Sequence, residues 1–291
     1  MKGRRTLFIA LTVSLMIVST AVVAVAHSSS KQTVIGAPNS VGMDAHPDGD
    51  VRWILPGPRG LDPAVFGTPG EERGLDLLPL TKRAATDDGY FVSGDGETPM
   101  MTPFSNKWAP ITGEAKVKVT DVTAVSQSST QDQINAEFKF TSPDGKNSYR
   151  LVVKKALPEV DHENFGGVGV NVLQHGATGI GTPLMPQLMA FIAFWGAGDL
   201  YVNGQLQKQK RFVHFMLSER VRSSDDAGYE LAFNADVDPE GSLQAHLILP
   251  PVALNEDGPV PDSPVPTAFT LPNGNDQPFL HIMYDTVRVQ N

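Results

Sequence analysis

Alternation of apolar and polar residues begins at Gly113, and it constrains the fold of this 291-residue chain more than any other feature. The stretches AKVKVTDVTAV (115–125), INAEFKF (134–140) and YRLVVKK (149–155) repeat with a period of two. That period is typical of a strand with one buried face. Because Pro143-Asp144-Gly145 supplies a turn between the second and third stretches, the pattern predicts a β-hairpin there.

Six more stretches have the composition of strands, and turn residues such as Asn203-Gly204 and Asp238-Pro239-Glu240-Gly241 lie between several of them. They are GGVGVNVL (166–173), DLYVNGQLQ (199–207), RFVHFMLSERV (211–221), YELAFNADV (229–237), SLQAHLIL (242–249) and FLHIMYDTVRV (279–289). One further segment, PLMPQLMAFIAFWGAG (183–198), suits either a short buried helix or a buried strand. The sequence thus predicts an all-β fold, an antiparallel β-sandwich or barrel-like fold of about nine strands.

The part of the chain before Gly113 is different in character. Residues 27–50 are small, polar and without periodicity, so we expect a flexible tether. Residues 51–112 combine frequent Pro and Gly with scattered aromatics, which favours an irregular layer packed on a core formed by residues 113–291.

The N-terminus has the pattern of a secretory signal peptide over residues 1–26. Lys2, Arg4 and Arg5 precede an apolar run that ends in Ala24-Val25-Ala26, a small-residue cleavage site. The run of about 20 residues is also long enough for an uncleaved membrane anchor, which would be the chain's contact with a membrane. Both alternatives predict an exported protein, periplasmic or extracellular.

Charge and composition exclude several classes of function. The net charge of −9 and the lack of a basic stripe argue against nucleic acid as a partner. The chain has no cysteine, so it can hold neither a thiol nucleophile nor thiolate-bound zinc or iron–sulfur clusters. The serine-hydrolase motif G-x-S-x-G and the zinc-protease motif H-E-x-x-H do not occur.

A phrase used twice provides the sharpest candidate site. FVHFMLSERVR (212–222) resembles FLHIMYDTVR (279–288), and both place a histidine two residues before a methionine. Residues two apart share one face of a strand, so His214 would lie beside Met216, and His281 beside Met283. With His246 from a third strand, these side chains form a candidate metal site if the three strands are neighbours. Imidazole with thioether suits copper, particularly Cu(I), and three imidazoles suit zinc. Core packing of the same residues is the alternative.

Calcium is a second metal candidate, with carboxylates at alternate positions in NADVDPEG (234–241) and DAHPDGD (44–50). The sequence therefore predicts an exported, non-catalytic binding or structural protein of the cell envelope or extracellular space. Its partner would be a metal ion, a small ligand or another envelope protein. The alternative is an extracellular enzyme that acts on a polysaccharide or small lipid-like substrate in a β-fold cleft, with His162, Glu163, His175, Trp195 and Arg220 as the residues to inspect.

Overall fold

The structure is a computed structural model. It describes residues 39–47, 50–55, 106–124, 129–158, 165–181, 187–225, 228–231, 238–250, 252–255, 258–261 and 280–290, and the backbone of five short strands between residues 67 and 101. These short strands form two small sheets, β3 (Gly67–Thr68) with β4 (Glu71–Glu72), and β5 (Ala84–Ala85), β6 (Tyr90–Val92) and β7 (Pro99–Met101).

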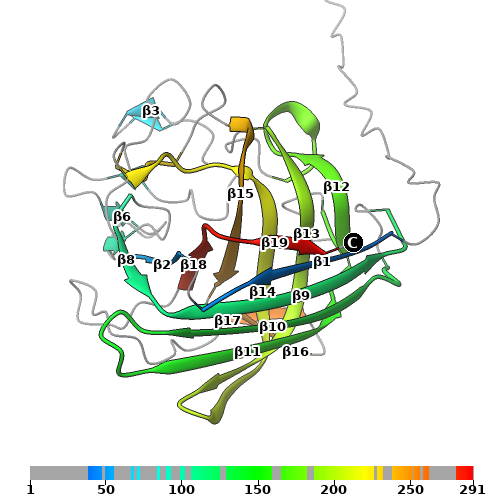
Figure 1. The fold of residues 1–291 in the computed structure, drawn as a ribbon, viewed down its shortest axis with the longest axis horizontal. Helices are drawn as coiled ribbons and strands as arrows, with labels where there is room; N and C mark the ends of the chain where they lie inside the picture. The colour runs from blue at the N-terminus through cyan, green and yellow to red at the C-terminus, as the bar shows by residue number, and fades with distance from the viewer. Residues whose placement is uncertain are drawn as a thin grey trace, which may run out of the picture. The chain divides into compact units, whose positions relative to one another are not determined.

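One antiparallel sheet of 14 strands organises the described residues and curls into a half-barrel (Figure 1). Its path runs through β19 (Arg288–Gln290), β1 (Asn39–Ala45), β9 (Gly113–Asp121), β10 (Gln133–Thr141), β11 (Ser148–Ala156), β13 (Leu188–Val202), β14 (Gln205–Arg220), β15 (Asp238–Leu249), β18 (Leu280–Tyr284), β2 (Val51–Ile54) and β8 (Trp108–Ile111). Off this path, β12 (Val168–Gln174) pairs with β13, and the hairpin of β16 (Val252–Asn255) and β17 (Gly258–Pro261) pairs with β14. The expected antiparallel β-fold is confirmed, in its barrel-like form.

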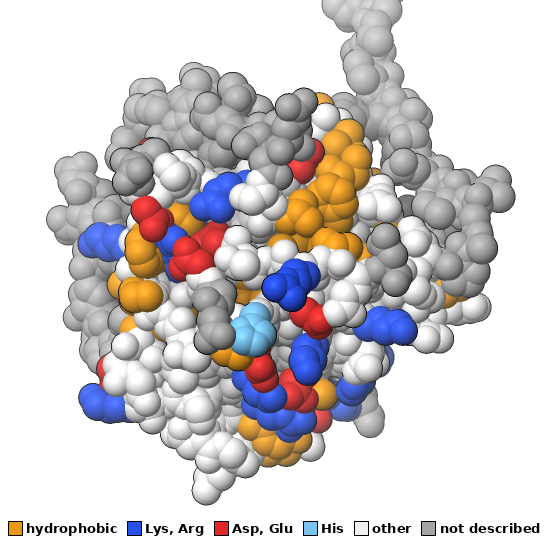
Figure 2. Space-filling model, in the orientation of Figure 1, with side chains coloured by type: hydrophobic (Ala, Val, Ile, Leu, Met, Phe, Trp, Pro, Cys, Tyr) orange, Lys and Arg blue, Asp and Glu red, His pale blue; other side chains and the backbone are white. Residues whose placement is uncertain are grey.

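Strands β9, β10 and β11 have one buried and one solvated face, as their alternation predicts. On the solvated face, Lys139 Nζ lies 2.6 Å from the Glu114 carboxylate and 3.2 Å from that of Glu137, which also pairs with Arg150. Figure 2 shows cationic and anionic side chains next to one another on the face in view. Exposed pairs of this kind add little stability, so these strands are held mainly by their buried face.

The segment that suited either a helix or a strand is a strand, since residues 188–202 form β13. Its Phe, Ile and Trp side chains fit a pleated, buried surface. A two-residue turn at Asn203 (φ 51°) and Gly204 (φ 78°) joins β13 to β14, in the conformation that matches the twist of a hairpin. Within the described ranges the one helical element is the 3₁₀ turn η3 (Gly176–Thr178), and no helix there is long and apolar enough to cross a membrane.

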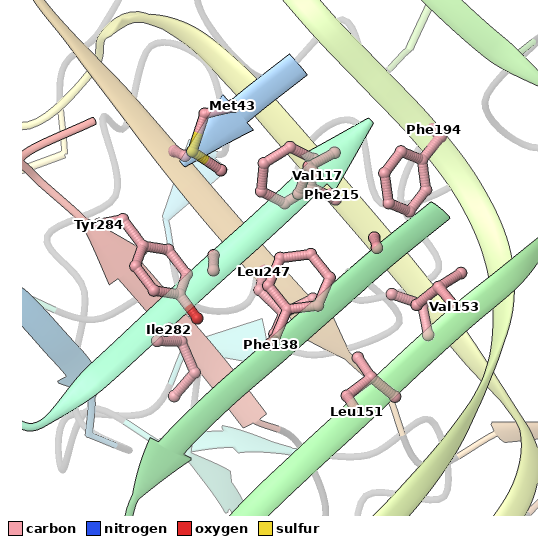
Figure 3. Close-up of a cluster of buried hydrophobic side chains, with 14 of the residues drawn as sticks. Met43, Val117, Phe138, Leu151, Val153, Phe194, Phe215, Leu247, Ile282 and Tyr284 are labelled. Atoms are coloured by element: carbon pink, nitrogen blue, oxygen red, sulfur yellow. The ribbon is translucent and has the colours of Figure 1, made fainter. Parts of the chain in front are cut away.

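The inner face of the curled sheet holds the main hydrophobic core. Phe138 on β10 meets Phe215 on β14 at a ring distance of 5.3 Å, and Trp53 on β2 meets Tyr149 on β11 at 5.5 Å (Figure 3 shows part of this core). Gly196 of β13 allows the neighbouring strand β11 to pack closely, because an added Cβ would lie 2.8 Å from Val153 Cγ1. Met43 on β1 and Trp53 on β2, from strands near opposite ends of the sheet, belong to the same buried cluster.

Two predictions for the N-terminal half need correction. Residues 39–45, assigned to a flexible tether, form β1, because Val41, Met43 and Ala45 alternate toward the inner face against β9. Residues 51–54 and 108–111, assigned to an irregular layer, form β2 and β8 at the edge of the main sheet.

Two predictions for the C-terminal half also differ from the structure. The expected turn Asp238-Pro239-Glu240-Gly241 lies at the start of β15. In the expected strand 229–237, only Leu231 pairs, through an isolated bridge to Arg222, and residues 232–237 lie outside the described residues.

Two buried carboxylates hold strand β12 in place by accepting hydrogen bonds from its backbone N–H groups. The Val168 N–H donates to Asp132 Oδ2 at 2.8 Å, and the Val170 N–H donates to Asp121 Oδ2 at 3.2 Å. Burial raises the pKa of the Asp121 carboxyl to about 6, the Val170 N–H opposes this rise, and the nearby Asp132 carboxylate adds to it. Asp121 therefore keeps its proton to a higher pH than an exposed aspartate does, and its ionisation at neutral pH costs the folded protein stability.

The Asp121→Asn variant is expected to be more stable than the parent protein at pH 7.5. Because the folded pKa lies above the ordinary 3.8, the stability from this group is full below about pH 4 and is lost as pH rises through about 6. Asparagine keeps the acceptor for Val170 and carries no charge, so the gain should be about 2–3 kcal/mol at pH 7.5 and vanish near pH 3.5. Urea unfolding at both pH values measures it, and a gain that grows at acid pH would contradict the assignment.

One hydroxyl group in the inner core has no hydrogen-bond partner among the described residues. It is the buried OH of Tyr284, whereas the equally buried Tyr229 donates its OH to Asp285 Oδ2 at 2.9 Å. Tyr284→Phe should therefore raise the free energy of unfolding by about 1 kcal/mol, and Tyr229→Phe should lower it by at least as much. Thermal and urea unfolding test the pair, and equal losses in both variants would overturn this account.

Candidate functional site

The three histidine-bearing strands are neighbours, which is the condition that the sequence left open. In the order β14, β15, β18, His246 lies directly opposite Met216 on one side and Met283 on the other. Two residues further along β15, Ile248 lies opposite His214 on β14 and His281 on β18. Since residues two apart share a face, His214, Met216, His246, His281 and Met283 occupy one contiguous area, here called the histidine–methionine patch.

His246 lies at the centre of this patch. Its ring centroid is 5.4 Å from that of His214 and 5.6 Å from that of His281. The two methionines are its directly opposed neighbours, a relation that places Cβ atoms about 4.5–5.5 Å apart. Met216 and Met283 are each 1% exposed, and His281 is 2% exposed. Four buried side chains with potential metal-binding atoms therefore surround the central imidazole, which is itself half-buried and has its Nε2 shielded from solvent.

The patch lies on the outer face of the sheet, away from the main core. The inner-face residues Phe215, Leu247 and Ile282 alternate with patch residues along the same three strands. Met216 belongs to a second hydrophobic cluster with Trp195 and Phe212, and Met283 to a third with Tyr229. These strands are thus buried on both faces.

Local contacts orient His214. Its Nδ1 lies 3.1 Å from the carbonyl oxygen of Phe194, and its ring stacks on Trp195 with 4.3 Å between centroids. A carbonyl can only accept a hydrogen bond, so Nδ1 carries the hydrogen and the lone pair of the neutral ring is on Nε2. A hydrogen bond of this kind is how proteins commonly orient a metal-binding imidazole.

His246 is held in its neutral form. Burial lowers its pKa well below the ordinary value of 6.5, and the positive charge that His214, His281, His175 and Arg222 can carry lowers it further. Its Nε2 has no hydrogen-bond partner in the described part of the chain. A neutral imidazole with a buried, unused nitrogen is the form that binds a metal ion, and a costly form to bury for packing alone.

The side chains do not form a site of three imidazoles as they stand. Among the described residues, no three His, Asp or Glu side chains are grouped so that they could hold one metal ion. Two imidazoles that share a tetrahedral metal at about 2.0–2.1 Å have ring centroids roughly 5 Å apart, close to the spacing of each adjacent pair here. The arrangement therefore suits two imidazoles, or one imidazole with thioethers, better than three imidazoles.

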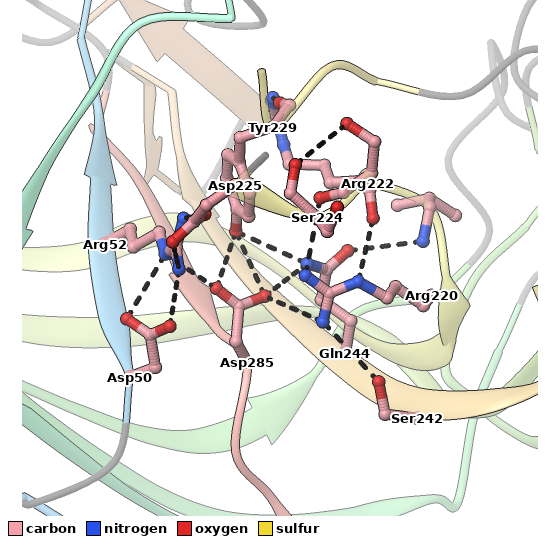
Figure 4. A network of polar contacts seen from close by, with 12 residues as sticks. Asp50, Arg52, Arg220, Arg222, Ser224, Asp225, Tyr229, Ser242, Gln244 and Asp285 are labelled. Atoms are coloured by element: carbon pink, nitrogen blue, oxygen red, sulfur yellow. Dashed lines mark hydrogen bonds and ion pairs between the residues drawn. The ribbon is translucent and has the colours of Figure 1, made fainter. Parts of the chain in front are cut away.

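A network of charged residues, drawn in Figure 4, adjoins the patch because Arg52 lies directly opposite Met283. At its centre Arg52, opposite Met283, contacts the carboxylates of Asp50, Asp225 and Asp285; its Nε lies 2.9 Å from Asp285 Oδ2. The Arg52 guanidinium also lies against the rings of Trp108 and Tyr229, at 4.1 and 4.2 Å from their centroids. These contacts join four separate segments of the chain.

Gln244 and Arg222 connect the network to the patch. Gln244, two residues before His246, donates from Nε2 to Asp285 and accepts the Val221 N–H at Oε1. Arg222 donates to the Tyr229 carbonyl oxygen at 3.1 Å. Burial lowers the pKa of the Arg222 guanidinium to about 10, so it stays protonated at neutral pH. A fixed positive charge therefore stands near His246.

Other sequence-predicted residues have varied places. Trp195 stacks on His214, and Arg220 Nη1 lies 3.8 Å from Asp285 Oδ1. His175, which the sequence did not place among the patch residues, is buried just after β12. Of the calcium candidates, Asp44 accepts a hydrogen bond from Gln290, and Asp50 pairs with Arg52.

The remaining candidates lie in other parts of the chain. His162 and Glu163, and residues 234–237 of the second calcium candidate, are outside the described residues. The Arg52 network was missed by sequence reasoning, although an arginine within the apolar run VRWIL (51–55) was a signal for it.

No known protein-family model matches this chain, and no curated protein or solved structure matches it either.

The stability of the protein is expected to fall at acid pH through His246. Because its folded pKa lies below the ordinary 6.5, this group's contribution is full above pH 6.5 and is lost as pH falls below it. His246→Leu should therefore reduce the slope of the free energy of unfolding against pH, by up to about 1.4 kcal/mol per pH unit below pH 6.5. Urea unfolding at pH 7.5, 6.5 and 5.5 measures the slope. His46→Leu, which changes an exposed histidine, is the control, and an equal slope in all three proteins would refute the prediction.

Proposed function

We propose that this chain is a non-catalytic metal-binding protein and that the histidine–methionine patch holds the ion. One observation carries the proposal: three strands bring three imidazoles and two thioethers together in register, in an area where every member except the half-buried His246 is buried. Copper and zinc are the ions that imidazole ligands suit.

The electrostatics of the patch favour binding over acid–base catalysis. A general base works best when its pKa lies near the operating pH, whereas the pKa of His246 is far below it. The carboxylate of Asp285, which directly follows β18, is already engaged by Arg52, Tyr229 and Gln244. These groups are arranged to hold an ion in place, and less suited to move protons.

The N-terminal segment supports a location outside the cytoplasm for this function. The basic residues, the apolar run and Ala24-Val25-Ala26 have the pattern of an export signal, cleaved or kept as an anchor. We therefore propose a periplasmic or extracellular metal-binding protein. It would receive its ion from another envelope protein or pass the ion to one.

Metal content tests the proposal directly. The full chain is expressed in medium supplemented with copper and zinc, purified without a tag, and measured by inductively coupled plasma mass spectrometry. About one equivalent of copper or zinc is expected, because one central imidazole organises the patch. His246→Leu should lose the metal, and the exposed-site control His46→Leu should keep it.

Circular dichroism and urea unfolding establish that each variant is folded before its metal is counted. If His246→Leu does not fold, His281→Gln replaces it, because glutamine keeps a polar side chain of similar size. A parent protein without metal, both as purified and after incubation with copper or zinc, would overturn the proposal. So would a metal content that both patch variants retain.

A further inference from the structure

We infer that the patch selects a soft monovalent ion, Cu(I) or its analogue Ag(I), through the row Met216, His246 and Met283. This inference rests on the proposed metal-binding function and goes further, because it names the ion class and the ligands. It follows from three features of the patch: the register of the three strands, the absence of a three-imidazole group among the described residues, and the charge around His246.

The register gives His246 a thioether on each side. In antiparallel sheets, directly opposed residues are the closest cross-strand neighbours, and diagonal ones lie about 7–8 Å apart between Cα atoms. Met216 and Met283 are the directly opposed residues, while His214 and His281 are diagonal. A metal ion at His246 Nε2 would therefore have a directly opposed thioether from each adjacent strand, while the ring centroids of the diagonal residues His214 and His281 lie 5.4 and 5.6 Å from that of His246. One imidazole with two thioethers is a soft ligand set, which favours Cu(I) over zinc.

The charge of the surroundings points to the same ion. The three ligands of the row are neutral, and Asp285 is committed to Arg52 and its other partners. The protonated Arg222 contributes positive charge at His246. In a buried site, each added positive charge on the ion increases both its desolvation cost and its repulsion from this guanidinium. A monovalent ion is therefore favoured over a divalent one.

The methionines are placed as ligands and not only as packing. Each is 1% exposed and flanks an imidazole whose Nε2 has no hydrogen-bond partner in the described ranges. Met43, which is 0% exposed, lies instead in the inner core, away from any described histidine contact. It is thus a matched control, a buried methionine on the other face of the same sheet.

Titration with Ag(I) and Zn(II) tests the inference on the full protein labelled with ¹³C at the methionine methyl groups. Ag(I) nitrate in chloride-free buffer at pH 7 avoids the redox chemistry of copper. Methyl resonances of Met216 and Met283, assigned with Met→Leu variants, are expected to shift with about one equivalent of Ag(I). The Met43 resonance should stay unchanged. Zn(II) should leave all three in place.

Affinity measurements complete the test. Equilibrium dialysis should show Ag(I) bound at least about tenfold more weakly by Met216→Leu and by Met283→Leu, and unchanged by Met43→Leu. Leucine replaces methionine with little change of volume, so folding should survive. Zn(II) binding that depends on His246 and equals or exceeds Ag(I) binding would overturn the soft-ion inference and leave the metal-binding function standing. Binding of neither ion would overturn both.

Discussion

Burial of both faces of one sheet is the constraint on which the rest of this structure depends. Strand β14 buries eight consecutive residues, Arg211–Ser218, so it presents apolar side chains to the inner core and a mixed set to the outer face. Polar groups on a buried outer face cannot rely on water and need partners within the protein. This requirement explains why imidazoles and guanidinium groups on and near β2, β14, β15 and β18 lie close to polar partners, among them the buried carboxylate of Asp285 and the half-exposed carboxylates of Asp50 and Asp225.

The patch and the charged network depend on each other through this shared face. Arg52 and Arg220 form ion pairs with Asp50, Asp225 and Asp285, and the charge of Asp285 also acts on Arg222. The removal of one buried partner would leave an uncompensated charge. Gln244 and His246 are two residues apart on β15, and Asp285 directly follows β18. A change in the network therefore alters the electrostatic field at the central imidazole, and an ion bound in the patch would in turn act on Arg222.

Local pattern was enough to predict the β-class and most of the strands, because alternation and turn chemistry operate over a few residues. It also selected the five patch residues, four from the two copies of the repeated phrase and His246 from a third strand. The adjacency of β15 to β18 could not be predicted, because it depends on pairing between distant segments. The same holds for Arg52, whose partners Asp225 and Asp285 lie far along the chain.

Where the predictions were wrong, long-range pairing had overridden composition. The short run NSVGMDA (39–45) looks like a tether, but β9 and β19 pair with both of its edges and make it a strand. Conversely, YELAFNADV has the composition of a strand, yet its first residue belongs to the Arg52 network. Tyr229 lies beside Arg52 and donates a hydrogen bond to Asp285. Strand propensity depends on the neighbours that a segment finds, and a single sequence does not reveal them.

The pairing of early with late segments has a consequence for how the chain is made. Strand β1 needs β19, and β2 needs β18, so residues 39–54 have no complete set of neighbours until residues 280–290 have been synthesised. Pairings so far apart in sequence close slowly and leave strand edges open in the meantime. A ribosome-bound chain can therefore form the β9–β10–β11 meander early, while its sheet closes last. Until then, the edges of that meander lack the neighbours that the complete sheet provides.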